Sequence, residues 1–455
     1  MNNKNRLKEE GISKLLWEYS VPAVMGTLVY ILYNIVDRIF ISFGVGRLAI
    51  AGLSITLPMF AFILAVGLFV GVGGGALISI NLGAGRDEEA EKILGNAVAL
   101  FLGVGVIMAA GTMFFLDDIL RLFGATPQNL PYAYDYMTVI LYALPFQLCF
   151  IGLNHIIRGE GNPKTAMKMS MIGCGLNIIL DPLFIFTMNM GITGAALATV
   201  ISNVIVAGMQ IYHFIGSKER RISLKVKYLK LEKNIIKEIS NIGIAPFIMQ
   251  MSNSVVVIFI NKNLNFYGGD IAIAAYGIIN SINVLFYMPI VGMYQGSQPI
   301  LGFNYGAKIY PRVRDAYKMT LKVAFSISLA AFIMAMLLPN ILIAPFINDD
   351  PELFDLTVRS LRIVFSMVFC VGFHLIGGSY FQAVGRAKVT TFLNVIRQVV
   401  LMIPMIYILP KYFGVDGVWI ATPVTDFTLA FITFFFVKKE FKRLEELSER
   451  SEALA

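Results

Sequence analysis

Asn81-Leu82-Gly83-Ala84 returns later in the chain as Asn304-Tyr305-Gly306-Ala307, and this repetition sets the architecture. An aliphatic tetrapeptide precedes each copy at the same spacing, Leu48-Ala49-Ile50-Ala51 in one case and Ile271-Ala272-Ile273-Ala274 in the other. Further pairs share nearly the same offset: Gly161-Asn162-Pro163-Lys164 with Gly385-Arg386-Ala387-Lys388, Pro182 with Pro404, and 191–199 with 414–422. Self-similarity over such a long period indicates two related halves.

Composition places both halves in a membrane. Of the 455 residues 57% are hydrophobic and 15% are charged, whereas a soluble protein carries roughly a quarter charged residues. A large soluble protein with an oversized core, the alternative, would lack polar side chains to cover its surface. Apolar runs long enough to cross a bilayer recur with short breaks. They predict twelve transmembrane helices, near 15–43, 48–80, 92–116, 132–157, 165–188, 192–216, 235–261, 271–303, 316–338, 353–384, 390–409 and 415–437.

The predicted fold class is therefore an all-α integral membrane protein of two six-helix lobes. Both lobes begin on the same side of the membrane because six helices separate their starts, so a pseudo-two-fold axis along the membrane normal relates them. We expect an N-lobe at 1–216, a cytoplasmic basic linker at 217–233, a C-lobe at 234–437 and a charged cytoplasmic tail at 438–455.

The positive charges indicate orientation. The net charge is +8, and the basic residues gather in short segments between apolar runs. This placement is typical of cytoplasmic loops that face anionic lipid, and it argues against a nucleic-acid partner. We expect a monomer in the lipid bilayer with both termini in the cytoplasm.

Two acidic residues lie inside predicted spans of the first half, where a charge is costly and needs a reason. Asp37 and Asp181 each lie six or seven residues from the outer end of a span, which places both roughly 10 Å below the surface. Asn177 lies one turn deeper than Asp181 on the same helix face. Thr199 enters from outside at a similar depth, and Tyr136 is within reach of this layer.

These side chains predict a cation-coupling site. Two carboxylates in a low dielectric resist ionising together, which suits reversible proton binding. Oxygen ligands of this type equally suit Na⁺, a hard cation. The alternative is that each aspartate braces a bent helix, which Asp181-Pro182 encourages because proline breaks the backbone ladder.

The second half carries a different pair of charges. Arg397 lies about nine residues from the inner end of its span and Asp426 about eleven, so neighbouring antiparallel helices place them at one depth. We predict a buried Arg397–Asp426 ion pair with a structural role.

The sequence lacks the marks of an enzyme. It has no nucleophile triad, no Cys/His set with metal spacing and no ATPase domain, and its three cysteines all lie in apolar runs. We expect no catalytic residues, no cofactor and no metal other than Na⁺ at the coupling site. A membrane receptor or enzyme is the alternative from another class, and energy for transport would come from an ion gradient.

Several motifs together resemble the multidrug and toxic compound extrusion (MATE) family. They are Pro22 and Val36-Asp37 in the first span, Asn81-Leu82-Gly83-Ala84-Gly85, Arg158-Gly159-Glu160-Gly161-Asn162-Pro163, and Asn177 with Asp181-Pro182. The likeness covers about residues 10–440. It implies a prokaryotic cytoplasmic-membrane antiporter that exports lipophilic, often cationic drugs by alternating access, coupled to H⁺ or Na⁺.

The resemblance also assigns roles to residues. The cation site of the branch with an N-lobe acidic pair matches Asp37, Asn177, Asp181 and Thr199, with Tyr136 in support and Pro22 where the first span can bend. Another branch places a glutamate in the seventh span, and 243–261 here contains no acid. A lipid-linked oligosaccharide flippase of the same superfamily is the alternative transport function, but it would need basic residues in its cavity.

Overall fold

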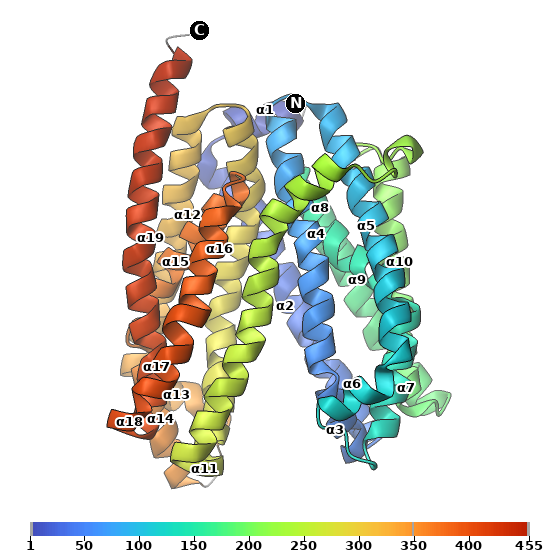
Figure 1. The fold of residues 1–455 in the computed structure, drawn as a ribbon, viewed down its shortest axis with the longest axis vertical. Helices are drawn as coiled ribbons and strands as arrows, with labels where there is room; N and C mark the ends of the chain where they lie inside the picture. Colours follow the sequence, from blue (N-terminus) through green and yellow to red (C-terminus); the bar gives the residue numbers. More distant parts are fainter. Residues whose placement is uncertain (1–2, 348–349, 453–455) are drawn as a thin grey trace. The chain divides into compact units, whose positions relative to one another are not determined.

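A computed structural model describes residues 3–347 and 350–452, and within these residues the chain forms helices and no strands. Figure 1 shows their arrangement. The helices of the first half are α1 (Asn3–Glu9), α2 (Ile12–Gly44), α3 (Arg47–Ile55), α4 (Leu57–Gly83), α5 (Asp87–Phe114), α6 (Leu116–Leu122), α7 (Leu130–Tyr142), α8 (Leu144–Gly159), α9 (Pro163–Pro182), η1 (Leu183–Thr187) and α10 (Gly191–Gly216).

After a linker that contains η2 (Val226–Tyr228), the second half follows the same plan. Its helices are α11 (Lys233–Gly306), α12 (Tyr310–Leu337), α13 (Pro339–Ile343), α14 (Pro351–Phe365), α15 (Phe369–Ala383), α16 (Ala387–Val395), η3 (Ile396–Met402), α17 (Ile403–Ile408), α18 (Pro410–Phe413) and α19 (Val415–Glu452). Both η1 and η3 are π-helical segments in the fifth span of their half.

The membrane-spanning class is confirmed. Among the described residues eight single helices are long and apolar enough to cross a bilayer, and two bent pairs, α7 with α8 and α14 with α15, raise this number to ten. α11 contains 74 residues and is interrupted at Gly269, where φ is 63° and ψ is −161°, so it holds two spans. α2 supplies a further 33-residue helix. Each of the twelve predicted spans therefore falls on helices of the described chain.

Several of the expected spans are not single helices, and the span at 353–384 bends by 47° between Phe365 and Phe369. The span expected at 132–157 bends by 67° between Tyr142 and Leu144, because Pro145 has no N–H to continue the ladder. The span expected at 48–80 is broken at Thr56, whose hydroxyl donates to the Leu53 carbonyl oxygen at 2.7 Å. The next helix, α4, begins at Leu57 and has Pro58 in its first turn.

The internal repeat is visible in individual hydrogen bonds. After α4, the Arg86 N–H donates to the Asn81 carbonyl at 2.9 Å, and after α11 the Ile309 N–H donates to the Asn304 carbonyl at 2.9 Å. The Asn81 and Asn304 side chains each donate to the carbonyl four residues earlier, at 2.9 and 2.8 Å. Both helices thus end in the same type of turn, which supplies hydrogen-bond donors to carbonyls of the last helical turn.

The turn at 158–163 ties several elements together. Glu160 is 1% exposed and accepts hydrogen bonds from the Asn162 side chain at 2.7 Å and from the Arg221 backbone N–H at 3.3 Å. Its carboxylate also contacts a ring nitrogen of His213, near the end of α10. A buried charge with several partners fixes this turn against α10 and the linker.

The described chain divides into two compact units. One contains Met25–Gln250, and the other contains Met1–Val24 with Met251–Ala455. We call them the N-terminal and the C-terminal unit. The borders pass through α2 and α11 rather than through the linker, so the functional lobes at 1–216 and 234–437 remain a proposal. In the N-terminal unit, α4 packs against α8 and α5, and α9 packs against α10.

Candidate cation-binding site

Two acidic side chains meet inside the N-terminal unit. Asp37 lies in the C-terminal third of α2 and is 6% exposed, and Asp181 lies near the end of α9 and is 0% exposed. Their carboxyl groups lie within hydrogen-bonding range of each other. Two buried carboxyl groups at this distance favour sharing a proton or a cation over carrying two charges.

Local sequence explains where Asp181 sits. Pro182 follows it directly, and the helix widens at once into the π-helical segment η1. Proline removes one donor from the ladder, and π-helical turns of this kind occur often at functional sites. The backbone thus changes its winding at the residue that carries the carboxyl group.

Asn177 connects Asp181 to α10. In the amide orientation that satisfies both neighbours, its nitrogen donates to an Asp181 carboxylate oxygen at 2.8 Å, and its oxygen accepts from the Thr199 backbone N–H at 3.2 Å. The Thr199 hydroxyl lies 3.3 Å from the same amide. Asn177 and Thr199 are 2% and 4% exposed. The structure therefore brings together Asp37, Asn177, Asp181 and Thr199, the four residues that their depths had grouped.

Two oxygens near this cluster have unused hydrogen-bonding capacity. One carboxylate oxygen of Asp37 and the hydroxyl of Ser202 are buried without a partner among the described residues. Ser202 borders a small cavity together with Tyr33, Phe150, Gly173, Cys174, Asn177, Thr199 and Asn203. Buried oxygens without a partner cost free energy unless a proton, water or cation satisfies them. Oxygen-rich chemistry of this kind suits H⁺ or Na⁺.

Sequence reasoning missed Ser202 and Tyr33. Ser202 lies three residues after Thr199 on α10, and Tyr33 lies four residues before Asp37 on α2. Helical spacing puts each of them on the face of a chosen residue, so this spacing was the signal that could have found them.

The two supporting residues lie on α7 and on the first part of α2. Tyr136 is buried on α7, with its ring centroid 6.1 Å from that of Phe60, and α7 packs against α10. Pro22 is inside α2 but belongs to the C-terminal unit, whereas Asp37 on the same helix belongs to the N-terminal unit.

The C-terminal unit contains the Arg397–Asp426 ion pair. The guanidinium of Arg397, within η3, donates to one carboxylate oxygen of Asp426 from Nε at 3.1 Å and from Nη2 at 3.0 Å. Nε2 of His374 lies 3.4 Å from the same oxygen. Asp426 is 4% exposed. One guanidinium thus holds the buried Asp426 carboxylate through two hydrogen bonds, with the His374 ring beside them.

With its spans in two similar sets and polar side chains buried among the helices, the molecule has the features of a membrane transporter. The MatE family model matches residues 22–183 and 242–408, and the chain belongs to this family.

Individual relatives agree with this assignment. The chain is 30% identical over 430 residues to the multidrug export protein MepA of Staphylococcus haemolyticus, covering 94% of each protein. Crystal structures of a MATE transporter in a bent and in a straight conformation match with TM-scores of 0.92 and 0.91 and identities of 27% and 26%. They cover 99% and 98% of this chain and 99% of each structure.

Proposed function

We propose that this protein exports lipophilic, often cationic drugs across the cytoplasmic membrane in exchange for H⁺ or Na⁺. Membership of the MatE family and similarity to a multidrug export protein support the drug-export part. The observation that carries the coupling part is the buried Asp37–Asp181 pair, with Asn177 hydrogen-bonded to it and one Asp37 oxygen without a partner in the described chain.

Coupling follows from the cost of two buried charges. In the outward-facing protein, a proton or Na⁺ binds between the two carboxyl groups and reduces their repulsion. The outer part of α2 then repacks, and the helix bends near Pro22, where the ladder lacks a donor. This movement shrinks the drug cavity and releases the drug outward. In the inward-facing protein the cation leaves to the cytoplasm and drug enters.

One coupling ion suffices energetically. A proton that crosses about 100 mV contributes roughly 2.3 kcal/mol, and a pH difference of one unit adds about 1.4 kcal/mol. Together they can hold a gradient of several hundred-fold, on the order of 10^2.7, for a neutral drug.

Reconstitution tests the proposal. Purified protein in vesicles should export a fluorescent dye when a pH gradient or a Na⁺ gradient is imposed, and imposing them separately identifies the coupling ion. Asp37→Asn and Asp181→Asn should each abolish the gradient-dependent part. Asp117→Asn is the matched control, because Asp117 forms an exposed ion pair with Arg121 at 2.6 Å on α6. Gradient-driven export by either acidic-pair variant at the native rate would refute coupling at this site.

Orientation and assembly are part of the same proposal. The basic loops support cytoplasmic termini. Every residue at the acidic pair comes from one chain, which supports a monomer. A membrane-impermeant thiol reagent should label Lys8→Cys from the cytoplasmic side only, while the native cysteines, all buried, should stay unlabelled. Transport activity at one protein copy per vesicle checks the monomer.

A further inference from the structure

The first span is divided between the two compact units, and the border lies beside Pro22. Residues up to Val24 belong to the C-terminal unit, and α2 from Met25 onward belongs to the N-terminal unit. The outer part of α2 accordingly packs on η1, where the ring centroids of Phe40 and Phe186 are 6.3 Å apart.

The inner part of α2 packs closely on α11. A Cβ atom added to Gly296 would lie 2.5 Å from the Ser20 Cα, and one added to Gly292 would lie 2.7 Å from the Val24 Cα. The Ser20 hydroxyl also donates to the Met293 carbonyl at 3.4 Å. Two glycines one turn apart thus allow backbone contact between these helices.

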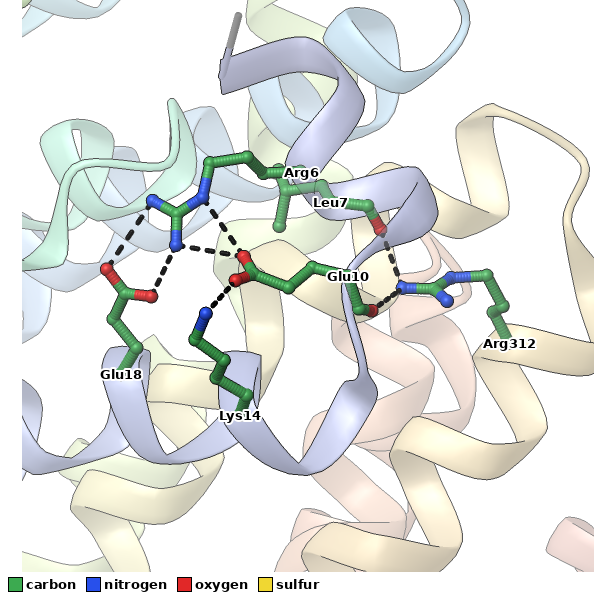
Figure 2. Close-up of polar contacts among 6 residues, drawn as sticks. All are labelled: Arg6, Leu7, Glu10, Lys14, Glu18 and Arg312. Atoms are coloured by element: carbon green, nitrogen blue, oxygen red, sulfur yellow. Dashed lines mark hydrogen bonds and ion pairs between the residues drawn. The ribbon is translucent and has the colours of Figure 1, made fainter. Parts of the chain in front are cut away.

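A cluster of charges fixes α1 to the start of α2 (Figure 2). The Arg6 guanidinium lies between two carboxylates, 2.6 Å from Glu18 and 2.9 Å from Glu10. Lys14 contacts the other oxygen of Glu10 at 2.5 Å. Leu7, which follows Arg6 on α1, is 2% exposed.

Arg312 of α12 joins this cluster to the rest of the C-terminal unit. Its Nη2 donates to the backbone carbonyls of Glu10 at 2.6 Å and Leu7 at 3.1 Å, as Figure 2 shows. Its Nε donates to the Asn304 amide oxygen at 3.2 Å, and the Asn304 amide nitrogen donates to the Leu7 carbonyl at 3.2 Å. These carbonyls end α1, where helical partners are missing and a cation is favourable.

We propose that Arg312 is a positioning residue for transport: it holds α1 and the inner part of α2 as a fixed piece of the C-terminal unit. Movement of the outer part of α2, which carries Asp37, is then taken up between Ser20 and Gly26. Without this anchor, α2 could pivot as one rigid rod, and cation binding at Asp37 would no longer drive a bend. This inference rests on the proposed coupling function.

The test combines a distance measurement with transport. Spin labels at Lys8→Cys and Lys318→Cys, both exposed positions of the C-terminal unit, report how firmly α1 is held against α12. In the native protein the distance distribution should be narrow and should stay unchanged between pH 5 and pH 8, with and without drug. In Arg312→Gln it should broaden, because each hydrogen bond lost from a charged donor raises the released population on the order of ten-fold.

Two further variants separate positioning from simple loss of structure. Arg312→Lys keeps a cation near the carbonyls and should restore much of the narrow distribution and of the drug exported per ion. Arg314→Gln is the matched control: Arg314 lies on the same helix but pairs with the exposed Glu445 at 2.9 Å, so this variant should behave as the native protein. Arg312→Gln should still carry ions but with less drug export per ion.

The outcomes are distinguishable from those of the coupling proposal. Asp181→Asn should leave the distance between the labels unchanged even though transport stops. A distance that shifts with pH or drug in the native protein would overturn the anchor. So would a narrow distribution and normal drug export per ion in Arg312→Gln.

Discussion

Lys308 has a backbone conformation that its side chain does not favour. Its φ is 60°, at the position that Gly85, with φ of 75°, occupies in the first half. The two turns share the same hydrogen bonds, since the Lys308 N–H donates to the Tyr305 carbonyl at 3.1 Å and the Gly85 N–H to the Leu82 carbonyl at 3.2 Å. The turn therefore requires a residue with left-handed backbone conformation in both halves. In the second half that residue is Lys308, whose Cβ makes this conformation unfavourable.

Exchanging these residue types should move stability in opposite directions. A left-handed conformation costs a residue with a Cβ about 1–2 kcal/mol, and the greater freedom of unfolded glycine offsets part of that. Lys308→Gly should therefore raise stability by up to about 1 kcal/mol, and Gly85→Ala should lower it by about 1 kcal/mol. Thermal unfolding in one detergent checks both, and a drop in Tm for Lys308→Gly would contradict the explanation.

The Arg397–Asp426 pair gives a second prediction at this scale. Removing one partner of a fully buried ion pair costs about 3–5 kcal/mol, while replacing both by apolar residues is often neutral. The Arg397 side chain is 27% exposed, so the cost here should fall at the lower end of that range or below it. Asp426→Ala should therefore unfold at a lower temperature than the native protein, and Arg397→Met with Asp426→Leu should recover much of the loss. If the pair is structural, the double variant keeps its transport rate per folded molecule. A folded double variant without transport would assign the pair a functional role.

Helices were predictable from the chain where they cross the bilayer, because a long apolar run permits little else. Counting residues to the helix ends put Asp37 and Asp181 at a common depth, and their carboxyl groups do lie close together. The 67° bend before Pro145 and the break at Thr56 were missed. Proline and threonine within an apolar run do not indicate whether or in which direction a helix will bend. The α1 cluster was missed as well, since Arg312 and Leu7 lie far apart in sequence.

Acid should loosen α1 through Glu10. Hydrogen bonds from Lys14 and then Arg6 hold the pKa of Glu10 below its usual value of 4.5. A lowered pKa in the folded state gives stabilisation that is present above the unfolded value and lost as the pH falls through the folded value. Amide hydrogen exchange of 3–18 should therefore stay slow from pH 7 to about 4.5 and rise, after correction for intrinsic rates, at lower pH. The variant Glu10→Gln should show faster exchange already at neutral pH.

For the whole molecule, two helices cross the border between the compact units. α2 passes from one unit to the other after Val24, and α11 passes back after Gln250. The resemblance between halves predicted two lobes joined by the linker, and that division stays a prediction; the compact units follow contacts instead. Contacts far apart in the chain, such as Ser20 with Gly296, decide the packing.

Cutting the chain in the linker tests this division. Fragments 1–224 and 225–455 should give dye export when they are made together, and each fragment alone should be degraded. The first lacks the helices that cover Ser20 and Val24, and the second lacks the segment that covers Gly292 and Gly296. Accumulation of either fragment alone as a stable, compact membrane protein would contradict this division, in which the start of α2 packs with the C-terminal unit.

The exchange also imposes an order on synthesis. Residues 3–24 leave the ribosome first, yet the surfaces that bury them, on α11 and α12, are made only after more than half of the chain. The first span must therefore wait in the membrane with its inner part uncovered while the N-terminal unit assembles around its outer part. The segment that is synthesised first is thus the last to be packed. Between its synthesis and the synthesis of α11 and α12, the unpacked chain is most exposed to proteolysis.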